Sequence, residues 1–434
     1  MKKAVMLLLL FLLVGLAAGY GPLQQPLPVA AADVSPKVKH IKMWKFKSNK
    51  EDYIIYDWIK QWNDRNPGVQ VTLELIPFTD YLENKLPTAF ATNSAPDIYM
   101  ISAGGFLKYA KAGCMLPLDR YLSPRLKKDF YGPSLEVASF NGKIMGLPIE
   151  REPVALYYNR KLFAERGLAP PRTWAELLRC AKLLNGNGMS GIYLPVLPSD
   201  YQTFIFYSFL AQLSDGVVDR NRRASLRTAG QKALQIWRDL TAYNYKFETA
   251  IQSTPDIHTL ASGKAAMQIC GFWSIRHLEK YYPDFQYGVV PVPVSEAPGS
   301  RRRSVYGGWF QAVNPGSKYK DEAAAFTVWM WGNGLARPVE WCTGVSTKFP
   351  ARISATAQVE KLFGRDKHAA ARLIFQNQIL PYAVPEFRYP SEISSAVSKA
   401  IQNAMFTEQP ITTVAAKADE AINNYLKQNP GEFK

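Results

Sequence analysis

The chain has 434 residues, 47% of them hydrophobic and 20% charged, and its formal net charge is +16. This length permits two or three domains with a large core, and the composition is that of an ordinary globular protein, which excludes a largely disordered chain. The surplus of basic residues indicates either a solvated surface that faces an anionic cell envelope or a site for a uronic-acid sugar or another polyanion. The four cysteines and four histidines are too scattered for a metal site, and most of the cysteines are expected to be free thiols.

The N-terminal segment has the pattern of a secretory signal. Residues 1–18 join two lysines to an apolar run and small residues, and this run is too short to cross a membrane. With the Pro-rich tether that follows, residues 1–32 predict a protein exported to the cell surface, the periplasm or the medium. Tyr20 stands where a lipoprotein signal would place cysteine, which removes the attachment atom for a lipid. A free protein, an uncleaved anchor and an atypical residue at this position remain open, and export argues against a nucleic-acid partner.

The next segment alternates strands and helices. The pattern predicts strands at 41–46, 69–76 and 98–101 and helices at 53–63 and 81–92, with a stop signal at residues 66–68. Short links between such elements are typical of a parallel, doubly wound sheet. Because ligands of these sheets lie beyond the carboxyl ends of the strands, residues 44–47, 78–81 and 102–106 are candidates for a binding site.

Residues 140–178 have the most informative pattern. Asn141-Gly142 predicts a tight turn, followed by a strand at 144–148. A charged triplet, Glu150-Arg151-Glu152, is expected to interrupt the sheet before a second strand at 154–158. Asn159 then opens a short helix, and Thr173, with Glu176 three residues later, forms a capping box at the start of another.

Several short motifs follow one another in a characteristic order. They are Asn-Pro-Gly at 66–68, Ala-Pro-Asp-Ile at 95–98, Leu-Pro-Leu at 116–118, Gly-Lys-Ala-Ala-Met at 263–267, Gly-Phe-Trp at 271–273, Tyr-Gly-Gly-Trp at 306–309 and Pro-Ala-Arg at 350–352. In this order the chain, from about 39 to 426, resembles the bacterial extracellular solute-binding proteins of family 1, the maltose-binding-protein-like receptors of ABC importers. The charged triplet resembles the crossover between their lobes.

The resemblance implies an α/β, type II periplasmic-binding-protein fold. Two lobes, each with a doubly wound and mostly parallel sheet, would enclose a ligand cleft. Carried onto this chain, one lobe comprises residues 38–149 and 304–348, and the other comprises residues 150–303 and 349–434. The helical segment 393–426 would pack on the second lobe.

The function implied by the resemblance is that of a receptor that binds a carbohydrate, most simply an oligosaccharide, closes by a hinge motion and delivers it to membrane permease subunits. It would act as a monomer, with no cofactor, metal or catalytic step. Alternatives are a binding protein for a non-sugar or polyanionic ligand (a peptide, a polyamine or a uronic-acid polymer), a secreted polysaccharide-acting enzyme, and a sensor or adhesin. Glu150 and Glu152 alone do not support the enzyme, because carboxylates two residues apart on one strand flank a bond poorly.

Trp273 is the first candidate for ligand contact, since the matching family tryptophan packs against the sugar; it would otherwise brace the surface between the lobes. Glu150 and Glu152 would either accept hydrogen bonds from ligand hydroxyls or hold the crossover through salt bridges. Tyr201 and Phe204 are candidates for an aromatic clamp or for core packing.

The other candidates rest on position alone: Trp44, Asp80, Tyr81, Ser102, Gly307, Gly308, Trp309, Arg352, Phe387 and Tyr389. Trp341 is interpreted as a packing residue. Arg301-Arg302-Arg303 predicts a solvated loop, an anionic ligand contact or a docking patch for the transporter. Residues 186–191 satisfy G-x-G-x-x-G, but they follow a helix and precede a strand, so they predict a loop and no dinucleotide site.

Overall fold

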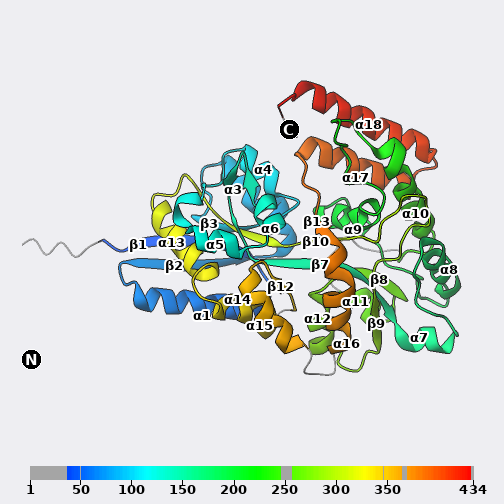
Figure 1. The fold of residues 1–434 in the computed structure, drawn as a ribbon, viewed down its shortest axis with the longest axis horizontal. Helices are drawn as coiled ribbons and strands as arrows, with labels where there is room; N and C mark the ends of the chain where they lie inside the picture. The colour runs from blue at the N-terminus through cyan, green and yellow to red at the C-terminus, as the bar shows by residue number, and fades with distance from the viewer. Residues whose placement is uncertain (1–36, 49, 246–256, 346, 364–368, 432–434) are drawn as a thin grey trace, which may run out of the picture. The chain divides into compact units, whose positions relative to one another are not determined.

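The structure is a computed structural model that describes residues 37–48, 50–245, 257–345, 347–363 and 369–431 (Figure 1). The predicted signal and tether, residues 1–32 with Tyr20, lie outside the described residues. Among the described helices, none combines the length and the apolar content that crossing a membrane requires.

The first sheet has five strands in the order β2-β1-β3-β11-β6. Their bounds are β1 (Lys39–Phe46), β2 (Val69–Ile76), β3 (Ile98–Ser102), β6 (Leu147–Pro148) and β11 (Trp309–Val313). β1 is parallel to β2 and to β3, whereas β11 is antiparallel to β3 and to β6. The three strands predicted from the first segment are therefore confirmed, and a strand from far along the chain completes their sheet.

The second sheet has the order β12-β7-β10-β13, and β8 and β9 also pair with β7. The bounds are β7 (Glu150–Asn159), β8 (Met267–Gly271), β9 (Tyr287–Val290), β10 (Ser304–Gly307), β12 (Phe349–Pro350) and β13 (Ala383–Pro385). β7 is antiparallel to each of its partners, and β10 is parallel to β13. In each sheet one strand, β11 or β7, thus runs against the others, and the predicted mostly parallel α/β fold is confirmed.

Two local predictions concern the segment 139–159. A hairpin of β4 (Ser139–Phe140) and β5 (Lys143–Ile144) turns through Asn141 and Gly142, both with positive φ, as the Asn-Gly pair predicts. The prediction that the charged triplet interrupts the sheet is wrong, because β7 includes it. Buried charges can continue a strand when other parts of the chain provide their partners.

The helices flank the two sheets (Figure 1). Their bounds are α1 (Lys50–Arg65), α2 (Phe78–Asp80), α3 (Leu86–Ala91), α4 (Phe106–Lys111), α5 (Pro124–Asp129), α6 (Gly132–Val137), α7 (Arg160–Glu165), α8 (Trp174–Leu184), α9 (Asp200–Leu210), α10 (Gln231–Thr241), α11 (His258–Ala261), α12 (Ser274–Tyr281), α13 (Lys320–Trp331), α14 (Ala336–Glu340), α15 (Ile353–Phe363), α16 (Ala369–Ile374), α17 (Ser391–Phe406) and α18 (Ile411–Gln428). Asn159 caps α7 through Leu162 N–H, and Thr173 caps α8 through Glu176 N–H, as predicted. The predicted C-terminal helices α17 and α18 lie side by side and pack on α10.

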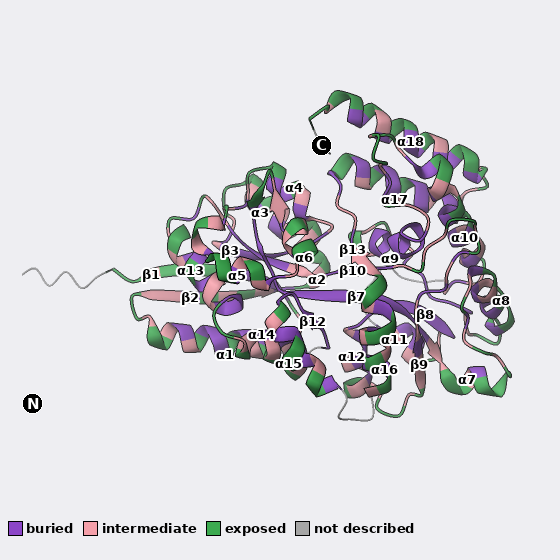
Figure 2. Cartoon of the chain, viewed as in Figure 1, coloured by how far each residue is buried: buried purple, intermediate pink, exposed green. Residues whose placement is uncertain are grey.

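Buried residues follow the strands of both sheets, while α1, α7 and α18 carry many exposed residues (Figure 2). The buried apolar side chains form two clusters, one around the first sheet and one around the helices beside the second sheet. Trp273 packs against both clusters.

Candidate functional site

Three segments of the chain pass side by side where the two sheets meet. Only Ile149 separates β6 from β7, and only Gly308 separates β10 from β11. At the start of β7, β12 pairs with one side and β10 with the other. Gly308 has φ +153°, and a Cβ there would lie 2.3 Å from the carbonyl oxygen of Glu150, so this crossing requires glycine.

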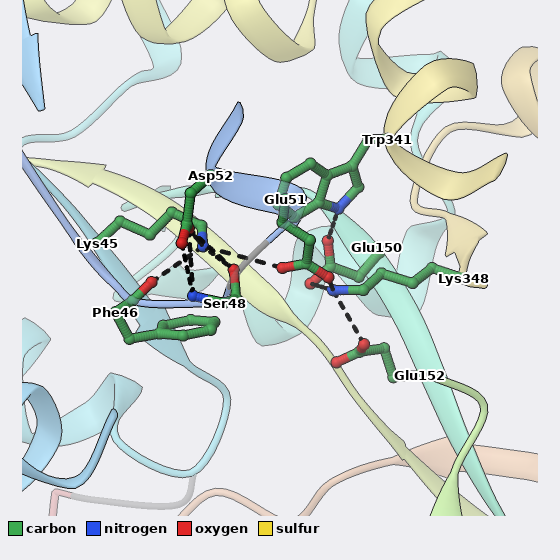
Figure 3. A network of polar contacts seen from close by, with 9 residues as sticks. All are labelled: Lys45, Phe46, Ser48, Glu51, Asp52, Glu150, Glu152, Trp341 and Lys348. Carbon is green, nitrogen blue, oxygen red and sulfur yellow. Dashed lines mark hydrogen bonds and ion pairs between the residues drawn. The ribbon is translucent and has the colours of Figure 1, made fainter. Parts of the chain in front are cut away.

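A network of buried charges lies on these crossings (Figure 3). Lys348, which is 3% exposed, comes directly before β12. Its Nζ lies 3.3 Å from a carboxylate oxygen of Glu51, 3.6 Å from one of Glu150 and 3.1 Å from one of Glu152. Trp341 donates from Nε1 to Oε2 of Glu150 over 2.6 Å. One lysine therefore joins the first turn of α1 to the start of β7.

A second lysine extends the network toward the end of β1. Lys45 is fully buried, and its Nζ lies 2.9 Å from Oδ1 of Asp52 and 3.9 Å from a carboxylate oxygen of Glu51. It also donates to the carbonyl oxygen of Phe46 and to the hydroxyl of Ser48. Asp52 in turn accepts from the backbone N–H of Ser48 over 2.9 Å. These contacts hold Lys45 and Ser48 against the first turn of α1.

Burial and proximity shift the pKa values of these groups. Burial is the main cause that raises the pKa of Glu150, Lys348 and the hydrogen bond from Trp341 oppose the increase, and Glu152 and Glu51 add to it; the resulting pKa is about 8. Burial also raises the pKa of Glu152. Burial alone would lower the pKa of Lys348, but the three carboxylates outweigh it and raise the value well above the ordinary one. Lys348 thus keeps its positive charge, and Glu150 holds a proton near neutral pH.

The positions of Glu150 and Glu152 bear on the two roles predicted for them. Both carboxylates are buried and lie within ion-pair distance of Lys348, which is the arrangement expected if they hold the crossover together. Contact between either carboxylate and a ligand remains a prediction.

Trp273 lies two residues after the last residue of β8 and is the N-cap residue of α12. Its ring folds back over the end of β8, so that a Cβ at Gly271 would lie 1.7 Å from Cζ3 of the indole. The residue is partly buried. Glycine at 271 is therefore what allows the indole to lie between the two hydrophobic clusters.

We expect Gly271→Ala to displace this indole. Overpacking of this kind costs about 1–3 kcal/mol in unfolding free energy. Urea denaturation measures the loss, and iodide quenching of tryptophan fluorescence should increase as the ring becomes more exposed. Gly68→Ala is the matched control, because nothing lies within 4 Å of a Cβ at Gly68. Equal stability of the two variants would contradict this packing.

Several predicted residues meet where β3, β10 and α9 come together. Ser102 is the last residue of β3 and pairs with Trp309 of β11. A Cβ at Gly307 would lie 3.2 Å from the ring of Phe204 on α9. A small cavity at this place is lined by Gly307, Gly308 and residues that follow β3 and β13. Of the predicted residues, Glu150, Gly307 and Gly308 line this cavity, and Phe204 of α9 lies next to Gly307.

Of the candidates near the end of β1, Tyr81 and Trp44 are buried, whereas Asp80 is exposed. Tyr81 is fully buried and donates from its hydroxyl to the carbonyl oxygen of Met100 over 2.6 Å. Trp44 is 9% exposed, with Nζ of Lys85 5.0 Å from its ring. Asp80 is exposed and accepts from Asn84.

The remaining candidates have partners within the protein. The guanidinium of Arg352 lies 2.7 Å from Asp129 and also donates to the carbonyl oxygens of Gly332 and Gly334. The hydroxyl of Tyr389 accepts from the N–H of Val217 over 2.8 Å. The ring centres of Trp309 and Phe46 lie 4.3 Å apart, and those of Phe387 and Tyr207 lie 5.2 Å apart. The hydroxyl of Tyr201 lies 3.6 Å from Sγ of Cys270.

The arginine triplet is largely engaged. Arg301 and Arg303 both pair with Asp215, at 2.8 and 2.6 Å, and Arg302 donates to the carbonyl oxygen of Gln378. All four cysteines are free thiols, as expected for most of them. Residues 186–191 form a turn with an isolated bridge, which confirms the predicted loop. Within the described ranges, no cluster of His, Cys, Asp and Glu could hold a metal ion.

Sequence reasoning missed Lys348 and the acidic residues at the start of α1, and it included Lys45 only as part of the candidate range 44–47. The sequence contains no local signal for Lys348, because its role depends on a contact between distant segments. A single lysine before the Pro-Ala-Arg motif can be recognised as an ion-pair partner only once β12 is known to pair with β7 at the charged triplet. Two further carboxylates, Asp200 and Glu386, were overlooked beside predicted aromatic residues. Both lie within 4 Å of a Cβ placed at Gly104.

Comparison with known proteins agrees with this architecture. The model of the family described as bacterial extracellular solute-binding protein matches residues 47–335. A Brucella abortus protein described as a binding protein is 26% identical over 272 residues, which cover 61% of this chain and 65% of that protein. The maltotriose-binding protein of Pyrococcus abyssi is 28% identical over 281 residues, or 62% of this chain and 57% of that protein. The matches thus span less than two thirds of these relatives.

Solved structures share the fold at lower identity. An ABC substrate-binding protein of Listeria monocytogenes in complex with cycloalternan has a TM-score of 0.76 at 18% identity, covering 90% of this chain and all of that one. Since the family model covers well over half of the sequence, the chain belongs to the bacterial extracellular solute-binding protein family.

Proposed function

We propose that this chain is the extracytoplasmic receptor of an ABC importer and that it binds an oligosaccharide between two lobes. The observation that carries the proposal is a small cavity lined by Glu150, Gly307 and Gly308 at the crossings between the two sheets, with the ring of Phe204 on α9 next to Gly307. An aromatic ring flanked by polar groups suits a sugar, which has apolar C–H faces and hydroxyl edges. The Pyrococcus relative named for maltotriose supports the same ligand class.

The lobes of this proposal are those expected from the sequence, 38–149 with 304–348 and 150–303 with 349–434. Strand β10, at the start of 304–348, pairs with β7. The chain passes between the two sheets at Ile149, at Gly308 and before Phe349, so the second of these crossings lies four residues after the expected boundary at 304; these crossings would act as the hinge. A ligand that contacts both lobes stabilises the closed arrangement, which the transporter can then recognise.

The proposal also includes export, a monomeric state and delivery of the ligand to membrane permease subunits. It assigns no catalytic step and no cofactor. Trp273, at the boundary of the two hydrophobic clusters, is proposed to stack on the ligand as the lobes close.

We expect one class of oligosaccharide to raise the unfolding temperature of residues 33–434. A ligand at a hundred times its dissociation constant adds about 2.7 kcal/mol of stability. Trp273→Ala should reduce this shift, whereas Tyr53→Ala, a change at a 75% exposed aromatic residue on α1, should leave it unchanged. If no oligosaccharide raises the unfolding temperature while peptides or polyamines do, the carbohydrate assignment is wrong.

A further inference from the structure

Two carboxylates outside the network of Figure 3 face one loop of the first sheet. Asp200 is the first residue of α9, Glu386 directly follows β13, and Gly104 lies between β3 and α4. A Cβ at Gly104 would lie 3.0 Å from Oε1 of Glu386 and 3.6 Å from Cγ of Asp200. The two acidic groups therefore lie close together, against the loop that follows β3.

Glu386 has no charged partner although it is buried. It is 7% exposed and lines the small cavity, and its Oε2 lies 3.6 Å from the position of a Cβ at Gly307. Among the described residues, no hydrogen bond or ion pair engages its carboxylate. By contrast, Glu150 and Glu152 have Lys348 nearby. Since its carboxyl oxygens have no partner among the described residues and are not fully enclosed by the protein, they remain available to a ligand at the cavity.

The surroundings of this pair are acidic. Burial raises the pKa of Glu386 well above its ordinary value, and Asp200 raises it further. Asp200 is exposed to solvent, yet desolvation by surrounding protein raises its pKa, with Lys108 opposing the shift. Glu83 is an exposed third carboxylate, and its pKa is raised by burial and by Asp200. Three acids and one lysine thus share this region in a chain whose net charge is +16.

The excess of acidic over basic groups in this region would favour some kinds of sugar over others. A uronic acid would place another negative charge beside three carboxylates, which is unfavourable. A hydroxyl offers one donor and no charge, so it would not offset the cost of ionising carboxyl groups whose pKa values are raised. A protonated amine offers three donors and a positive charge, and the ring of Phe204 beside Gly307 can pack against the apolar face of the same sugar.

We propose that Asp200 and Glu386 bind a protonated amine of the ligand, so that this receptor takes an oligosaccharide of amino sugars with free amine groups. The inference rests on the proposed function and narrows its ligand class. With such a ligand, the positive net charge of the chain would belong to the protein surface and not to the binding site.

Calorimetry with three matched probes tests the inference on residues 33–434: a tetramer of β-1,4-linked glucosamine, its fully N-acetylated form, and a neutral glucose tetramer. At about pH 6, where such amines are protonated, the glucosamine tetramer should bind at least about tenfold more tightly than the other two. Glu386→Gln and Asp200→Asn should each remove this preference while keeping the side-chain shape. Glu420→Gln, a change at an exposed carboxylate on α18, should preserve it. Thermal unfolding of each variant checks that it is folded.

The outcomes separate the two proposals. If the neutral or N-acetylated tetramer binds as tightly as the amine form, or if both carboxylate variants keep the preference, the inference is overturned and the carbohydrate receptor stands. If no oligosaccharide of any kind binds to the wild-type protein, the proposed function fails and takes this inference with it.

Discussion

Lys348→Met is expected to lower the free energy of unfolding by about 3–5 kcal/mol, the usual cost of removing one partner from a buried ion pair. Methionine keeps the length and much of the volume of the lysine stem. It leaves Glu51, Glu150 and Glu152 without the cation that lies within 3.6 Å of each of them. Urea denaturation followed by circular dichroism measures the loss.

Lys60→Met is the matched control. Lys60 also pairs with a carboxylate, Asp64 at 2.6 Å, but its side chain is 73% exposed. Exposed pairs contribute about 0–1 kcal/mol, so this variant should be nearly as stable as the wild type. Part of the loss in Lys348→Met should be recovered by adding Glu152→Gln, which removes an uncompensated charge. Similar stability of the two lysine variants would refute the role assigned to Lys348.

Glu150→Gln is expected to flatten the dependence of stability on pH. In the folded protein the pKa of Glu150 is about 8, compared with an ordinary value of 4.5. Between these values the folded state binds more protons than the unfolded chain, so stability falls as the pH rises from about 5 to 8. The wild type should therefore lose several kcal/mol over this window through Glu150. Glutamine has no such proton to release, and its carbonyl can still accept from Trp341.

Unfolding free energies of both proteins, measured at intervals from about pH 5 to pH 8, test this expectation. The two curves should diverge toward the alkaline end, with the variant the less sensitive to pH. Glu420→Gln removes an exposed carboxylate and should follow the wild-type curve. Parallel curves for Glu150→Gln and the wild type would show that Glu150 does not titrate in this range.

Features set by neighbouring residues could be predicted from the sequence. Asn159 and Thr173 cap helices through backbone groups three residues away, and Asn141-Gly142 turns within its own hairpin. Each of these depends on a short stretch of chain, which a pattern contains in full. The order of strands and helices around the first sheet follows in the same way.

Features set by distant pairing could not be predicted. The charged triplet continues β7 because Lys348, about two hundred residues later, lies within ion-pair distance of both of its acids. For the same reason the sequence points to Tyr201 and Phe387 but passes over their neighbours Asp200 and Glu386. An aromatic residue in a predicted loop attracts attention from the sequence alone. An acidic residue, which is common on any protein surface, indicates a site only when the fold shows which groups surround it.

The lone reversed strand in each sheet has a consequence for how the chain acquires its structure. The first sheet requires β11 at Trp309–Val313, and the second requires β13 at Ala383–Pro385. The first sheet is therefore complete only after about seven tenths of the chain is available, and the second only after nearly nine tenths. Pairings this remote in sequence require closure of long loops and slow the folding of the nascent chain. A polypeptide that stays open until late in synthesis is a suitable substrate for a secretion channel that accepts only unfolded chains.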